Sequence, residues 1–247
     1  MPKNKSLISD VIVELRVYAT PPRTMMSSLV VNSFISALFF LGSYWLGSYN
    51  AAFLPIASAT ILLWTLADAS VCNQLMFDRV RARAALEKEG TLQRFLLVKN
   101  IAVAVLAIPL TVLYGLLIVA MVGNWSAILY GVVAAMTLIW GWLGISNALS
   151  AYLPFDVLSI KGYVQNRSIW ISYGFLYGLP WIVLPAYALL MGLPFTLLGW
   201  TKATAAADHR FLALFIMLLC SVVIWILGLR VANSYTTRPN NRLKKFL

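Results

Sequence analysis

Long apolar stretches alternate with short charged segments along the chain. A helix needs about 20 apolar residues to cross the hydrocarbon core of a membrane. Six stretches meet this requirement, at residues 28–48, 51–74, 100–123, 126–149, 169–190 and 211–229. The pattern predicts an all-α integral membrane protein, with six transmembrane helices in a single domain that covers residues 1–247.

Composition agrees with a chain whose solvent is lipid. Of its 247 residues, 61% are hydrophobic and 11% are charged. Soluble domains carry about 25% charged residues, so a soluble enzyme is excluded. The two cysteines, Cys72 and Cys220, fall inside apolar stretches and imply no disulfide framework.

The basic residues indicate how the chain is oriented. The formal net charge is +11, and six spans would place 17 of the 19 lysines and arginines on one side. Positive charge marks the cytoplasmic side of membrane proteins. We therefore expect a multi-pass protein of the cell (plasma or inner) membrane. Its lead-in at residues 1–27 and its basic tail at 230–247 would both be cytoplasmic, and the charge needs no nucleic acid to explain it.

Residues 6–18 form a predicted amphipathic helix ahead of the first span. Apolar residues recur at helical spacing, while Asp10 and Glu14 fall on the other side. Ser6 is placed to cap the helix, and Pro21 ends it. Such a helix lies flat on a membrane surface.

The loop at residues 75–99 is the longest and most charged of the predicted cytoplasmic loops. Residues 77–90 read as a short helix in which Arg83 and Glu87 are four residues apart, and Gly90 ends it. Its mixed charge beside exposed apolar residues suits a docking surface. A solvated loop that only fixes the topology explains the same composition.

Residues 192–210 precede the last predicted span and form an apolar outer segment. Pro194 and Gly199 interrupt it, and it is too short to cross the membrane twice. A re-entrant or interface-lying element fits, with Trp200 as an anchor at the interface.

A small number of polar and small residues inside the predicted spans are candidates for a functional role. Asp68 is the only acidic residue within a span, and Asn73 lies near it in the sequence. Intramembrane acids are candidates for transport paths and proton relays, but structural hydrogen bonding explains Asp68 without either. Gly174 and Gly178 form a G-x-x-x-G motif that allows two helices to approach closely.

The residues that catalysis requires are missing. His209 is the only histidine, so a two-histidine metal site is impossible within this chain. The sequence has no phosphate-binding loop of the G-x-x-x-x-G-K-[ST] type. We therefore expect a chain that is not an enzyme, holds no cofactor and binds no ATP itself.

The layout resembles the permease subunit of ABC-type exporters, the six-span class that moves drugs, lipids or polysaccharides. The resemblance rests on the amphipathic helix at 6–18, the charged helix at 77–90, the outer element at 192–210 and the stretch at 147–154. It implies two copies of a separate ATPase that use ATP and Mg, a second identical or homologous permease, and an amphiphilic cargo. Residues implied to couple to the ATPase are Phe77, Asp78, Arg79, Arg81, Arg83, Glu87 and Glu89.

Two other functions remain open at the level of sequence. An accessory or assembly subunit of a membrane complex would need no route of its own. A secondary transporter would need ion-coupling groups, and Asp68 is the only acid available for that role within the predicted spans.

Overall fold

The computed structural model describes residues 6–20, 24–47, 59–60, 62–64, 66, 69–89, 91–123, 125–154, 178, 182–184, 186–191 and 207–238. Most of these residues are helical, and none of them lies in a strand. The principal helices are α1 (Leu7–Ala19), α2 (Thr24–Trp45), α4 (Ala69–Cys72), α5 (Gln74–Phe77), α6 (Arg79–Glu89), α7 (Gln93–Val122), α8 (Trp125–Tyr152) and α11 (Ala207–Thr237).

Three of the described helices are long and apolar enough to cross a membrane. Their spanning segments are Gln93–Ala120 in α7, Leu129–Tyr152 in α8 and Leu212–Thr236 in α11. Two shorter apolar helices are Leu29–Trp45 and Ile182–Met191. The all-helical fold with these three helices indicates a membrane protein. Half of the predicted span 51–74, and most of the predicted span 169–190 and of the outer element 192–210, lies outside the described residues.

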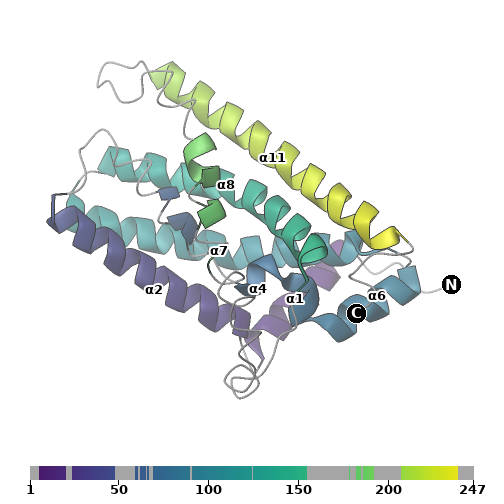
Figure 1. Ribbon diagram of the computed structural model, residues 1–247. Coiled ribbons are helices and arrows are strands. Elements are labelled where there is room, and N and C mark those ends of the chain that lie inside the picture. Colours follow the sequence, from purple (N-terminus) through teal and green to yellow (C-terminus); the bar gives the residue numbers. More distant parts are fainter. Residues whose placement is uncertain are drawn as a thin grey trace.

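Helices α7 and α8 form the centre of the bundle. Helix α8 contacts α4, α5, α7 and α11, while α7 also contacts α1 and α2. In Figure 1, α11 runs along α8 on one side of the molecule and α2 runs along α7 on the other. The short helices α1 and α6 lie where α7 begins and where α8 and α11 end. We call this end of the bundle the charged end.

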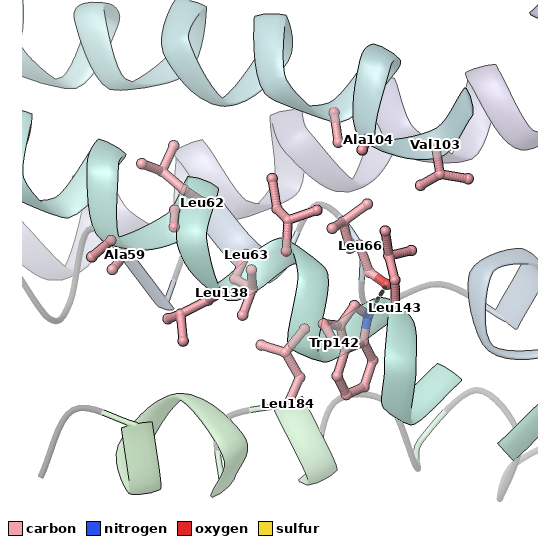
Figure 2. Close-up of a cluster of buried hydrophobic side chains, with 14 of the residues drawn as sticks. Ala59, Leu62, Leu63, Leu66, Val103, Ala104, Leu138, Trp142, Leu143 and Leu184 are labelled. Carbon is pink, nitrogen blue, oxygen red and sulfur yellow. Dashed lines mark hydrogen bonds between the residues drawn. The ribbon is translucent and has the colours of Figure 1, made fainter. Parts of the chain in front are cut away.

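Large apolar side chains fill the middle of the bundle. Trp142 of α8 is completely buried, and its indole N–H donates a hydrogen bond of 2.9 Å to the backbone oxygen of Leu66. Figure 2 shows this bond among leucines contributed by several segments, including Leu138 and Leu184. The bond satisfies a buried donor and fixes residue 66 to α8.

A second apolar cluster closes the charged end. It joins α5, α6, α7, α8 and α11, and we call it the base cluster. Its buried members are Leu75, Met76, Ala82, Leu92, Leu96, Ala151, Leu229 and Ala232. The inner side of α6 is thereby packed against the bundle.

Helices α8 and α11 touch through their backbones. A Cβ atom built on Gly144 would lie 2.5 Å from the backbone oxygen of Ile224 and 2.6 Å from the Cα of Trp225. A Cβ atom on Gly228 would meet the backbone of Gly144. Only glycine permits this approach, as is common between helices in membranes.

Several predicted helix boundaries correspond to observed ones. Ser6 caps α1, because its Oγ accepts a hydrogen bond of 3.2 Å from the backbone N–H of Ser9. Gly123 ends α7 with a φ of 76°, and its N–H donates to the oxygen of Val119. Helix α7 starts at Gln93, earlier than the predicted span at residues 100–123.

Candidate functional site

Four charged side chains form a closed ring of ion pairs at the charged end. Glu14 comes from α1, Asp78 from the junction of α5 and α6, Arg81 from α6 and Lys99 from α7. Arg81 pairs with Glu14 and, at 2.8 Å, with Asp78. Lys99 pairs with the same two acids, at 3.0 Å to Glu14 and 3.1 Å to Asp78. We call this arrangement the ion-pair ring, and it ties three segments of the chain together.

The centre of the ring is removed from water. Glu14 is 0% exposed, and Lys99 is buried with it. Burial by itself raises the pKa of the Glu14 carboxyl, but the charges and hydrogen bonds of Lys99 and Arg81 lower it further than burial raises it. The net result is a pKa below the ordinary value, so Glu14 is ionised at neutral pH.

Aromatic rings enclose the cations of the ion-pair ring. The Lys99 Nζ lies 5.4 Å from the ring centre of Tyr18 and 5.2 Å from that of Phe95, and Arg81 lies 6.0 Å from Phe95. Burial, followed by the nearby charge of Glu14, raises the pKa of Tyr18, which therefore stays neutral. Cations over aromatic faces gain additional attraction where water is excluded.

A second ion pair and a small cavity lie beside the ring. Arg94 at the start of α7 donates to Asp10 of α1 over 2.7 Å and 3.0 Å. The adjoining cavity has a volume of about 180 Å³. Its lining includes this pair, the Glu14–Arg81 pair of the ring, and Phe95 and Glu89. Helix α1 is thus attached to α7 at two places about one turn apart.

Helix α6 presents two different faces. Its inner face carries Arg81 and the buried Ala82 of the base cluster. Its outer face carries Arg79, Val80 and Arg83, with Val80 81% exposed. Arg83 and Glu87 form an exposed ion pair of 3.0 Å on this outer face.

The seven residues predicted to couple to an ATPase divide between these faces. Asp78 and Arg81 belong to the ion-pair ring, and Phe77 is half-buried beside them. The side chains open to a partner are Arg79, Arg83, Glu87 and Glu89.

The other predicted functional residues do not join the ring. Asp68 and Gly174 lie outside the described residues. Asn73 is completely buried between α4 and α5. A Cβ atom on Gly178 would meet no atom within 4 Å, whereas Cβ atoms on Gly144 and Gly228 would meet the backbone of a neighbouring helix.

Sequence reasoning missed the two central members of the ring. We expected Glu14 on the solvated side of the first helix, and this was wrong. Glu14 shares the buried face of α1 with Val11 and Tyr18, because Arg81 and Lys99 neutralise its charge there. The available signal was the spacing, since Val11 and Tyr18 stand three residues before and four residues after Glu14.

The described residues contain no group of three or more histidine, cysteine, aspartate or glutamate side chains placed to hold a metal ion. The ion-pair ring connects α6 mechanically to α1 and α7, so a displacement of α6 would be passed to both helices through buried charges.

No protein-family model, no curated protein and no solved structure matches this chain.

The lowered pKa of Glu14 gives a prediction about acid. A carboxyl whose pKa is lowered by folding stabilises the fold fully above its ordinary pKa of 4.5, and this contribution is lost as the pH falls through the lowered value. We expect the melting temperature of the purified protein to fall more steeply below pH 4.5 than that of Glu14→Gln. Equal slopes for the two proteins would show that the Glu14 carboxylate does not stabilise the fold.

Proposed function

We propose that this chain is the membrane-spanning permease subunit of an ATP-driven ABC-type exporter. In this proposal six helices cross the cell membrane and the charged end faces the cytoplasm. Two copies of a separate ATPase dock there, and a second identical or homologous permease completes the route. The cargo is an amphiphilic molecule.

The division of α6 into two faces is the observation that carries the proposal. A helix that only fixed topology would need no buried charges, because water solvates a surface loop. Here the inner face is fastened to α1 and α7 by the ion-pair ring and to the bundle by the base cluster. The outer face keeps Val80 and the charged pair of Arg83 and Glu87 open. An exposed apolar residue rimmed by charges suits a protein partner.

The distribution of charge supports the orientation. Helices α1 and α6 and the start of α7, which carry Arg16, Arg81 and Arg94, lie at one end of the bundle (Figure 1). The positive-inside rule places such an end in the cytoplasm, where ATP is available.

The ion-pair ring suggests how force would travel. Nucleotide-driven closure of the ATPases moves α6, and Arg81 and Lys99 carry the movement to α1 and α7. Because α7 is continuous from Gln93 to Val122, a shift at its start reaches the far side of the membrane. For ATP to drive transport, the ATPase must bind one state of the permease more tightly than the other.

Removing the outer face of α6 should uncouple ATP hydrolysis from transport. In the triple variant Arg79→Ala, Arg83→Ala and Glu87→Ala, we expect the purified assembly to lose at least tenfold in transport rate per ATP hydrolysed. The fold should remain intact, because exposed ion pairs contribute about 0.5 kcal/mol or less. Transport into vesicles and phosphate release are measured on the same preparation.

The control is Arg16→Ala, which removes an exposed charge from α1 without touching α6. It should leave the coupling unchanged. Normal coupling in the triple variant would refute the docking role of this face. A stable complex with another membrane protein and no ATPase would favour an accessory subunit.

A further inference from the structure

Among the buried polar side-chain groups that have no hydrogen-bond partner in the described part of the chain, four lie close to the base cluster in sequence. They are the side-chain amides of Gln74, Asn100 and Asn147 and the indole N–H of Trp225. Asn100 and Asn147 are 0% exposed and Gln74 is 1% exposed. Each comes from a different helix, namely α5, α7, α8 and α11.

These four residues lie at one depth. Asn100 follows Leu96 by one helical turn, Asn147 precedes Ala151 by one turn, and Leu96 and Ala151 both belong to the base cluster. One turn of an α-helix is about 5.4 Å long. Trp225 lies at the same level, because it precedes Leu229 by one turn. Gln74 stands between Cys72, whose sulfur is 3.7 Å from the Ser146 hydroxyl, and Leu75, whose N–H donates to Ser150, so it is level with Asn147 of α8.

Trp225 also indicates what lies on the side of this level that faces away from the charged end. It packs against the base cluster and against the large apolar core in the middle of the bundle. We call the four residues the polar layer, and its member Trp225 borders both apolar clusters.

Two hydroxyl groups next to the layer have partners, in contrast to the layer itself. Ser150 accepts a hydrogen bond of 3.0 Å from the backbone N–H of Leu75. The Cys72 sulfur lies 3.7 Å from the Ser146 hydroxyl. A buried amide without a partner costs free energy, and most buried polar groups in folded proteins are paired. Leucine would fill similar space at the three amide positions without that cost.

We propose that the polar layer binds the uncharged, hydrogen-bonding headgroup of the transported amphiphile. This inference rests on the proposed transport function and specifies its substrate class. Amides supply both donors and acceptors, which suits hydroxyl or amide groups. Lys99 stands next to Asn100 in the sequence, and its ammonium group is already paired with Glu14 and Asp78. The apolar cluster above the layer suits the hydrocarbon part of the same molecule.

The first test asks whether the amides cost stability, and it needs only the full-length chain in lipid nanodiscs. Asn100→Leu and Asn147→Leu should each raise the melting temperature by a few degrees, because each removes an unsatisfied buried amide. The matched control is Ser150→Ala, which removes a bonded hydroxyl at the same level of α8 and should lower the melting temperature. A lower melting temperature in both leucine variants would overturn the proposal.

The second test uses Cys72 as a reporter beside the layer. In the Cys220→Ser background, a charged methanethiosulfonate reagent should label Cys72 from water. Octyl glucoside, or N-octylacetamide, should slow this labelling at least threefold, below the micelle concentration of each. Protection by the first alone identifies a hydroxyl headgroup, and protection by the second alone identifies an amide headgroup. Asn147→Leu should abolish the protection.

Octyltrimethylammonium, which has the same alkyl chain and a charged head, should give no protection. Equal protection by this compound, or no labelling of Cys72 at all, would overturn the polar layer as a headgroup site. Neither test involves the ATPase. If no ATPase accompanies the chain while both tests succeed, the binding site stands and only the ATP-driven mechanism fails.

Discussion

Glu14→Leu is expected to lower the free energy of unfolding by about 3–5 kcal/mol, the usual cost of removing one partner from a buried ion pair. The substitution leaves Lys99 buried with Asp78, which it shares with Arg81. It also removes the charge by which α1 is held to α6, and one of the two by which α1 is held to α7. Thermal or denaturant unfolding of the purified protein measures the loss.

Two comparisons make this prediction specific to the buried ring. Arg83→Ala breaks the exposed pair of Arg83 and Glu87, whose side chains are 62% and 67% exposed, and should cost at most about 0.5 kcal/mol. The double variant Glu14→Leu with Lys99→Met should recover part of the loss, because it leaves Asp78 and Arg81 as a matched pair. If Glu14→Leu and Arg83→Ala cost the same, the ring is not what holds α1.

Gly228→Ala is expected to be about as damaging, at about 3 kcal/mol or more. The added methyl group would meet the backbone of Gly144, and a backbone cannot move aside as a flexible side chain can. Overpacking of a core costs about 1–3 kcal/mol when side chains can adjust, so a clash with backbone belongs at or above the upper end. The melting temperature of the variant in detergent provides the measurement.

Gly42→Ala is the matched control. Gly42 lies within α2, and a Cβ atom there would meet nothing within 4 Å. Alanine favours helix over glycine by about 1 kcal/mol, so this variant should be unchanged or slightly more stable. A stable Gly228→Ala protein would contradict the close packing of α8 against α11.

Local patterns predicted the elements of the charged end well. The cap at Ser6 and the apolar spacing after it predicted α1, and the helix-forming run around Arg83 predicted α6. Both signals lie within a few residues of the feature they predict. The number of spans depends on hydropathy alone, and the described residues confirm three apolar helices of sufficient length.

The ion-pair ring was beyond such patterns, because its members come from residues 14, 78, 81 and 99 and meet only after three helices have packed. Lys99 falls in the predicted loop 75–99, directly before the predicted span 100–123. In the fold, pairing with Glu14 neutralises it, so α7 continues through it from Gln93.

The contact of α8 with α11 was missed for a related reason. Gly144 and Gly228 belong to different helices and form no sequence motif together, whereas the G-x-x-x-G pair of Gly174 and Gly178 stands out within one helix. Close approach depends on which helices are neighbours, and spacing within one segment does not contain that information.

The most direct test of the permease proposal is a photo-cross-link from the outer face of α6. A photoreactive amino acid in place of Val80, in native membranes, should capture a separate chain that carries a phosphate-binding loop and hydrolyses ATP. The same amino acid in place of Ile8, which is 72% exposed on α1, should not capture that chain. Capture only of integral membrane proteins without ATPase activity, or of nothing, at position 80 would contradict the account.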